Sequence, residues 1–134
     1  MVRGQWVQIK PKGSNAHFER DKPAIDAACE RFIDDVLKPR FLPEICPTEF
    51  NYCIDIFGKW HGRSYRFIQR YRTDRPDADE REFDAPFTRL EYTGPDRFDL
   101  SYMRHTGQWN CIFRGLTLKQ AFETIESQIH FHPL

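Results

Sequence analysis

Apolar and polar residues alternate through residues 50–73, and this alternation predicts two antiparallel strands folded back on each other. One set of alternate positions is almost entirely aromatic or aliphatic, and we expect it on the buried face of a sheet. Its members are Phe50, Tyr52, Ile54, Ile56, Tyr65, Phe67, Gln69 and Tyr71. The intervening positions of the second half are Arg66, Ile68, Arg70 and Arg72, so the hairpin has one apolar face and one largely basic face.

The apolar positions also predict how the two strands pair. A turn at residues 60–61 would place Ile56 opposite Tyr65 on the buried face. The same register would place Asp55 opposite Arg66 on the basic face. A slip by one residue would turn the arginines into the core, so we expect the faces to be well specified.

Three further strands are expected after the hairpin, over 88–92, 98–102 and 109–113. Turn residues at 93–96 and 106–107 separate them. Pairing outward from these turns would set Cys111 opposite Tyr102, with the thiol on the apolar face of the sheet.

Helical spacing of apolar residues predicts one helix before the hairpin and one after the last strand. The first would begin at Asp21, with Pro23 in its first turn, and would end before Pro39. The second would begin at Thr117, which can form a capping box with Gln120. The expected buried stripes are Ile25, Ala28, Cys29, Phe32, Val36 and Leu37 in the first helix and Leu118, Ala121, Phe122, Ile125 and Ile129 in the second.

These elements predict a single-domain α+β fold: an N-terminal helix, a five-stranded antiparallel meander and a C-terminal helix, with both helices on one face of the sheet. Residues 1–18 are expected as an N-terminal arm or edge strand, because Trp6–Lys10 resembles a short strand. Residues 19–134 would form the domain. Within it, the acidic segment 74–85 is expected as a solvated loop.

Composition limits the classes of function. With 134 residues and 40% hydrophobic residues, the chain can bury one core. Lys plus Arg equals Asp plus Glu at 20 each, which argues against nucleic-acid binding by net charge alone. The four cysteines form no C-x-x-C pair, and no apolar run suggests a signal peptide or a membrane span. We therefore expect a reduced, cytoplasmic protein without membrane partners.

The order of elements resembles small uncharacterised bacterial domains of unknown function, which combine a helix, an aromatic meander and a closing helix. The resemblance covers roughly Asp21 to Ile129. It is carried by FNYCIDIFGKWHGRSYRFIQRYRT, EYTGPDRFDLSYMRHTGQW and the terminal HFHP. It implies a bacterial, cytoplasmic origin and no known activity.

The basic face of the hairpin and its turn form the candidate binding site, made of Lys59, Trp60, His61, Arg63, Arg66, Arg70 and Arg72. Cations and rings of this kind can hold single-stranded nucleic acid, the cations on phosphates and the rings on bases. The arginines could instead pair with Asp55 and with acidic residues of neighbouring strands. No RRM, KH or helix-turn-helix signature is present.

The leading hypothesis from the sequence is a non-enzymatic protein-interaction or oligomerising module. Trp and Arg dominate binding hot spots, and Trp60 lies at the tip of the expected hairpin. A free sheet edge could also form a homodimer by strand pairing. Single-stranded nucleic-acid binding through the arginine face is the alternative hypothesis.

A further alternative is an enzyme or metal site assembled from distant residues. His105, Cys111 and Asp55 could supply base, nucleophile and orienting group. His130 and His132 are weak candidates for metal ligands. Because no zinc spacing, nucleophile elbow or phosphate-binding loop occurs, we predict no catalytic residues and no cofactor.

Overall fold

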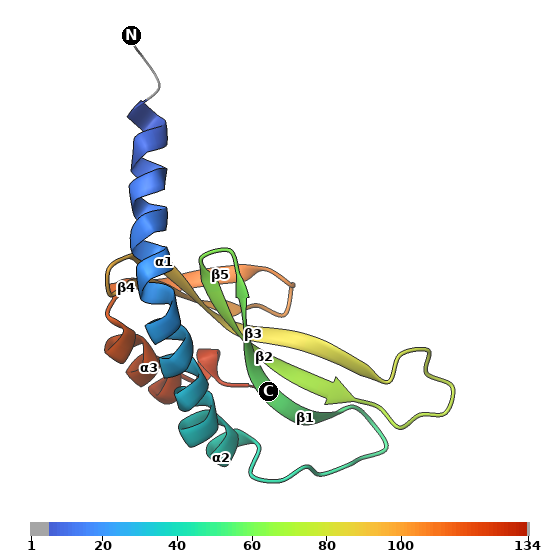
Figure 1. Cartoon of the computed structure of the whole chain (residues 1–134). Coiled ribbons are helices and arrows are strands. Elements are labelled where there is room, and N and C mark those ends of the chain that lie inside the picture. Colours follow the sequence, from blue (N-terminus) through green and yellow to red (C-terminus); the bar gives the residue numbers. More distant parts are fainter. Residues whose placement is uncertain (1–5, 134) are drawn as a thin grey trace.

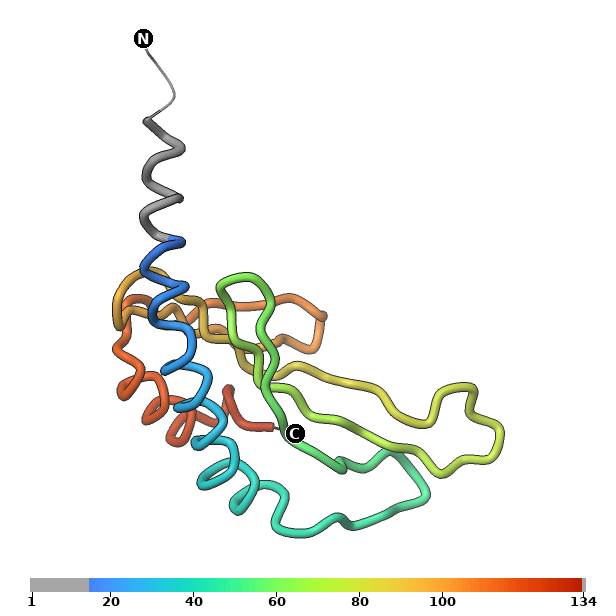
Figure 2. The backbone as a smooth tube through the Cα atoms, viewed as in Figure 1, coloured from blue at the N-terminus to red at the C-terminus, as the bar shows by residue number. Residues whose placement is uncertain are grey.

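The computed structural model describes the backbone of residues 6–133 and the side chains of residues 15–133. The five strands form one antiparallel sheet in the order β1-β2-β3-β4-β5, and the chain runs through them in sequence (Figure 1 and Figure 2). The predicted α+β meander is therefore confirmed. The elements are α1 (Trp6–Phe32), the π-helical segment η1 (Ile33–Leu37), α2 (Lys38–Phe41), β1 (Tyr52–His61), β2 (Ser64–Arg72), β3 (Glu82–Gly94), β4 (Arg97–Met103), β5 (Trp109–Leu116), α3 (Leu118–Ser127) and the 3₁₀ turn η2 (Ile129–Phe131).

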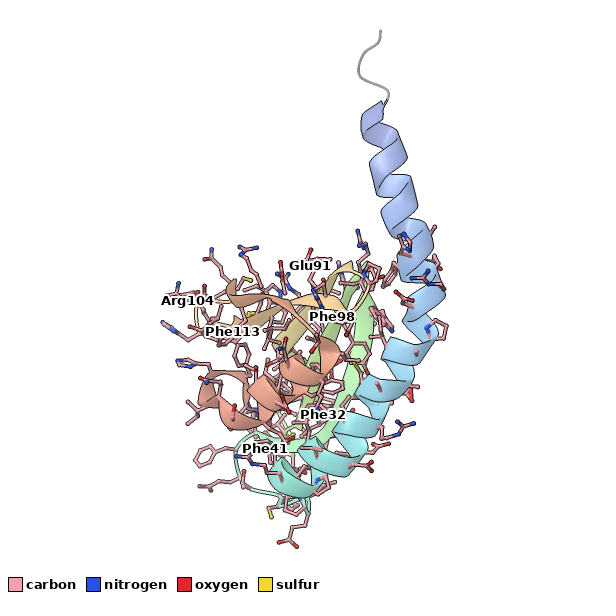
Figure 3. The ribbon with its side chains drawn as sticks, turned by 90° about the vertical axis from the view of Figure 1, so that its left-hand side faces the viewer. Phe32, Phe41, Glu91, Phe98, Arg104 and Phe113 are labelled. Atoms are coloured by element: carbon pink, nitrogen blue, oxygen red, sulfur yellow. The ribbon has the colours of Figure 1, made fainter. Side chains whose placement is uncertain are left out.

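Both helices cover the same face of the sheet, as expected. The ring of Phe32 in α1 stacks on Phe122 of α3 with centroids 4.3 Å apart, and meets Phe67 of β2 edge-on at 6.2 Å. Phe32 and Phe98 lie between the helices and the sheet in Figure 3. Fully buried members of this core include Cys29, Leu37, Ile56, Leu100, Ala121, Ile125 and Phe131.

The N-terminal helix is longer than the sequence predicts. Because α1 begins at Trp6, the expected strand over 6–10 and the expected helix start at Asp21 are both wrong. The Asp21 carboxylate is not a cap: it accepts a hydrogen bond from the Tyr92 hydroxyl at 2.6 Å and so fastens α1 to β3. Residues 1–5 and the side chain of Trp6 lie outside the described residues.

Pro39 does not end the first helical region, contrary to the prediction. The chain passes through η1 and continues as α2 to Phe41, with Pro39 in the first turn of α2. The Lys38 N–H donates to the Ile33 carbonyl five residues back, so the π-helical turn directly precedes Pro39 and already interrupts the i→i−4 bonding that a proline would break. The predicted buried stripe is largely confirmed, since Ile25, Cys29, Phe32 and Leu37 are all buried.

The β1–β2 hairpin turns at Gly62 and Arg63, later than predicted. Tyr65 pairs with Trp60, four residues beyond the expected Ile56. Gly62 has a φ of +60°, which a two-residue hairpin turn requires and which glycine adopts without steric cost. A shift by an even number keeps the faces unchanged, so Ile56 and Tyr65 still enter the core.

The corrected register changes the partners on the basic face. Asp55 lies opposite Arg70, and Arg66 lies opposite Lys59 instead of the expected Asp55. A bulge in the first half of β1 also interrupts the alternation. Phe50 lies before this strand and is 71% exposed, so the expectation that it is buried is wrong.

The segment 74–85 is only partly a loop, because β3 already begins at Glu82. Arg72 lies opposite Glu82, and Arg70 lies opposite Asp84. Part of the acidic segment therefore lies in β3, where arginines of β2 are its strand partners. The far ends of β2 and β3, with the loop that connects them, reach past the helices (Figure 1).

A bulge between β4 and β5 moves Cys111 to the other face of the sheet. Leu100 pairs with Phe113 as expected, but Cys111 pairs with Ser101 rather than Tyr102. The expected position of the thiol on the apolar face is therefore wrong. One extra residue is enough to reverse the alternation of side chains.

The C-terminal helix α3 begins with the predicted capping box. Gln120 N–H donates to the Thr117 hydroxyl at 3.1 Å, and Thr117 N–H donates to the Gln120 side chain at 3.0 Å. Ile129 is 77% exposed because α3 ends at Ser127, so its expected place in the buried stripe is wrong. No helix in the described part of the chain is both long and apolar enough to cross a membrane.

Candidate functional site

The sheet face opposite the helices carries three cations in adjacent strands, which we call the cationic row: Lys59, Arg66 and Arg89. Strand pairing sets Arg66 between the other two, opposite Lys59 of β1 and opposite Arg89 of β3. Arg66 lies between the buried Tyr65 and Phe67, so its side chain leaves the sheet on the uncovered face. Like charges directly opposite each other destabilise a sheet, so stability does not explain the row.

Trp109 of β5 lies next to the cationic row. The guanidinium carbons of Arg66 and Arg89 lie 5.6 and 5.0 Å from the centre of the indole ring, within the range of cation–π interactions. Strand β4 lies between β3, which carries Arg89, and β5, which carries Trp109. The β4 residue that pairs with Arg89 is Ser101, whose small side chain is buried. Trp109 itself is half-buried, so part of its ring stays accessible to a ligand.

The two arginines of the cationic row have no acidic partner. Among the residues that the structure describes, none forms an ion pair or hydrogen bond with either guanidinium. Their Nε atoms are buried without a hydrogen-bond partner. An unmet buried donor costs about 1–3 kcal/mol. Such groups on an open face create a strong local attraction for an anion.

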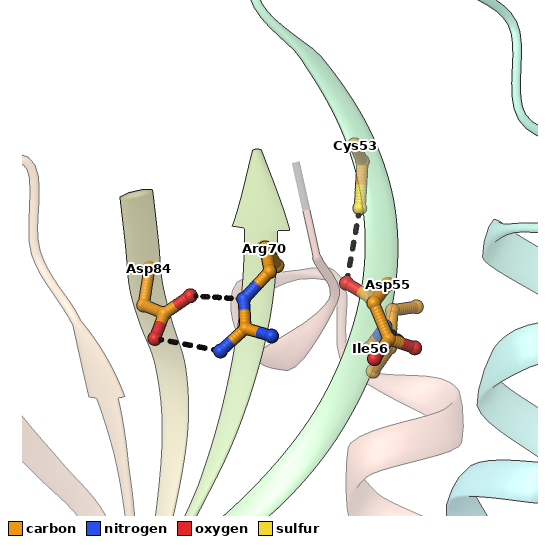
Figure 4. Close-up of polar contacts among 5 residues, drawn as sticks. All are labelled: Cys53, Asp55, Ile56, Arg70 and Asp84. Carbon is orange, nitrogen blue, oxygen red and sulfur yellow. Dashed lines mark hydrogen bonds and ion pairs between the residues drawn. The ribbon is translucent and has the colours of Figure 1, made fainter. Parts of the chain in front are cut away.

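The other arginines of β2 differ, because each already has a carboxylate. Arg70 donates from Nε and Nη2 to Asp84 at 2.9 and 3.3 Å (Figure 4). This hydrogen bond raises the pKa of Arg70. Arg72 pairs with Asp74 at 3.1 Å. These two residues stabilise β2 against β3 and its loop, whereas Arg66 has no carboxylate partner among the described residues.

Trp60 and Arg63 lie on the helix side of the sheet, away from the cationic row. The Trp60 indole N–H donates to Asp26 of α1 at 2.9 Å, and its ring packs edge-on against Phe18 at 5.4 Å. The guanidinium carbon of Arg63 lies 5.3 Å from the ring of Tyr92. The structure thus divides the predicted site: Trp60 and Arg63 join α1 to the sheet, whereas the rest remain on the open face or in the exposed turn.

Arg89 and Trp109 belong to the site but were not predicted. Arg89 stands between the buried Thr88 and Leu90, so the alternation that placed Arg66 could also have placed Arg89 on the open face. The approach of Trp109 could not be found in the same way. It depends on the bulge between β4 and β5, which turns Trp109 to the open face.

The residues considered for catalysis are dispersed. Asp55 lies on β1 and Cys111 on β5, which are the two opposite edges of the sheet. His105 follows β4 and lines a cavity that contains neither of them. The Cys53 thiol, beside Asp55 in Figure 4, is directed to the Asp55 carbonyl at 3.3 Å. This arrangement assembles no nucleophile with a base.

The two C-terminal histidines contact different groups. His130 packs its ring against Tyr102 with centroids 5.2 Å apart. A ring nitrogen of His132 lies 2.8 Å from the Glu126 carbonyl oxygen. No group of three or more potential metal ligands occurs within the described part of the chain.

The fold and this site together define a single-domain α+β protein whose sheet has one helix-covered face and one open, basic face. The chain belongs to the family described as domain of unknown function DUF3024, whose model matches residues 16–133. The resemblance to a family of unknown function is thereby confirmed. No curated protein and no solved structure matches the chain.

Proposed function

We propose that this protein binds single-stranded nucleic acid on the open face of its sheet. Arg66 and Arg89 contact backbone phosphates, Lys59 extends the positive charge along the row, and Trp109 stacks on a base. One observation carries the proposal: two guanidiniums without acidic partners among the described residues adjoin one half-buried indole on the sheet face opposite the helices.

A single strand fits this face better than a duplex. The three cations run across neighbouring strands of a sheet, and neither helix is placed on that face to enter a groove. An unpaired strand can lay its phosphates along the row and turn a base onto the indole. Because the chain has no net charge, affinity depends on this local row rather than on the whole surface.

The part of the protein-interaction hypothesis that rested on Trp60 has less support. The Trp60 indole N–H is bonded to Asp26, and its ring packs on Phe18 and Tyr65. An anchor residue of a protein interface must be free to enter a pocket of the partner. Trp60 instead holds α1 on the sheet, whereas Trp109 stands on the open face.

The first test is the binding of fluorescently labelled single-stranded RNA and DNA, measured by anisotropy at low and physiological salt. We expect saturable binding that weakens as salt rises, because phosphate contacts release counterions. Arg66→Gln with Arg89→Gln should lower affinity at least about tenfold. It should also reduce the slope of log affinity against log salt by about 1.4, since each phosphate contact on a single strand contributes about 0.7.

A matched variant separates local from general charge. Arg75→Gln with Arg97→Gln removes the same charge from the loop after β2 and from the first position of β4. This control should bind within about twofold of the native protein, because distant sites act independently. No binding at low salt, or an equal loss in both double variants, would contradict the proposal.

A further inference from the structure

A second site lies on the other side of the sheet, where a cavity of about 450 Å³ opens between the ends of the strands and the C-terminal segment. Its floor includes Phe87 of β3 and Tyr102 of β4. Phe87 belongs to the helix-covered core, and Tyr102 packs edge-on against Phe131 at 6.0 Å. The cavity is therefore separate from the cationic row, which leaves the sheet on the opposite face.

The rim of this cavity is basic. Arg104 and His105 contribute from the turn that follows β4, and His130 and His132 contribute from the C-terminal segment. Three of the five histidines of the chain thus surround one cavity. No aspartate or glutamate lines it, and Arg104 forms no ion pair within the described residues.

We propose that this cavity binds a small organic anion, with an acidic head group on the basic rim and an apolar body on the aromatic floor. The volume lies within the usual range for small-molecule sites, which are largely apolar with a few convergent polar groups. Arg104 is the main contact for the head group, because a guanidinium donates two parallel hydrogen bonds to a carboxylate or sulfonate.

His130 is the second contact for the head group. It enters from a different segment than Arg104, and the contact with Tyr102 positions its ring at the rim. We assign His132 no contact with the head group, since its ring nitrogen already lies 2.8 Å from the Glu126 carbonyl oxygen. Two basic groups from separate segments can thus meet one anion, while the apolar floor rejects strongly hydrated ions such as free phosphate.

The experiment uses the full chain and the fluorescent probe 8-anilinonaphthalene-1-sulfonate, which combines a sulfonate with aromatic rings. We expect saturable binding of one probe per chain and displacement by octanoate. The neutral analogue 1-octanol should displace the probe at least about tenfold less effectively, because it lacks the charge that the rim recognises. Backbone amide chemical shifts of Ala85, Phe87 and residues 102–105 should move on addition of octanoate.

Matched variants test the rim. Arg104→Gln with His130→Gln should weaken octanoate binding at least about tenfold. The control, Arg97→Gln with His61→Gln, changes the same residue types at two strand ends, the start of β4 and the end of β1, that do not line the cavity. It should bind within about twofold of the native protein. Thermal unfolding of both variants checks that the fold is retained.

The same octanoate titration on the variant Arg66→Gln with Arg89→Gln distinguishes the cavity from the cationic row. Octanoate binding should be unchanged there, whether or not that protein still binds nucleic acid. The proposal is overturned if octanoate fails to bind, if octanol binds as tightly, if the rim variant binds as well as the control, or if the shifts cluster on the cationic row.

Discussion

Gly58 shows how one residue can depend on a single contact across the sheet. It lies opposite Phe67 on the core face of β1, and the ring of the buried Tyr65 covers its backbone. A Cβ atom at this position would overlap the Tyr65 ring and hydroxyl. Tyr65 cannot yield, because the rings of Trp60 and Phe67 pack on it at 5.2 Å each.

We therefore expect Gly58→Ala to lower the free energy of unfolding by about 1–3 kcal/mol, the usual cost of overpacking a core. Urea unfolding followed by circular dichroism measures the loss. Gly94→Ala is the control, because a Cβ there meets no described atom within 4 Å. Equal stability of Gly58→Ala and the native protein would show that Tyr65 moves aside.

Single residues also show why the site was only partly predictable. The alternation of β2 identifies Arg66 as a residue of the basic face, but the sequence alone suggested Asp55 as its partner. Because the hairpin turns later than predicted, the β1 residue opposite Arg66 is the cation Lys59 instead of Asp55. The local pattern thus defines the face, whereas the pairing of charges depends on where the chain turns.

At the scale of elements, the start of the helix with a complete local signal was predicted correctly. The capping box of α3 involves residues three apart, so it needs no tertiary contact. The first helix lacked such a signal: Asp21 and Pro23 suggested a start in the middle of α1. Tertiary packing decided its extent, because Phe18, before the predicted start, is buried against the sheet.

We expect Thr117→Ala to destabilise the protein by about 1 kcal/mol, because it removes the acceptor for the Gln120 N–H at the start of α3. Urea unfolding measures the change. Thr106→Ala provides the control, since the exposed Thr106 side chain makes no hydrogen bond to any described residue. A loss of similar size in both variants would argue against the cap as the cause.

At the scale of the whole molecule, buried tyrosines make the free energy of unfolding depend on pH in the alkaline range. Burial, followed by the hydrogen bond to Asp21, raises the pKa of Tyr92 to about 12. Burial also raises the pKa of Tyr65, and a hydrogen bond to Asp74 raises that of Tyr52. In the unfolded chain these hydroxyls ionise near pH 10. These hydroxyls therefore stay protonated to a higher pH in the folded state than in the unfolded state.

We expect the free energy of unfolding to be insensitive to these groups below about pH 10 and to fall as pH rises above it, because the unfolded chain then loses protons first. Tyr92→Phe should make this decline shallower between pH 10 and about 12. Urea unfolding at several pH values, followed by circular dichroism, measures both slopes. An unchanged slope in Tyr92→Phe would mean that its ionisation does not contribute.

The sequence by itself determined the number and order of the strands, the helix-covered face of the sheet and the start of α3. These features follow from short-range periodicity and capping, which each segment carries alone. Only the tertiary structure decided the turn at Gly62 and Arg63, the bulge that turns Cys111 outward, and the meeting of Trp109 with Arg66 and Arg89. These features depend on contacts between segments far apart in the chain, and a local pattern is compatible with more than one such pairing.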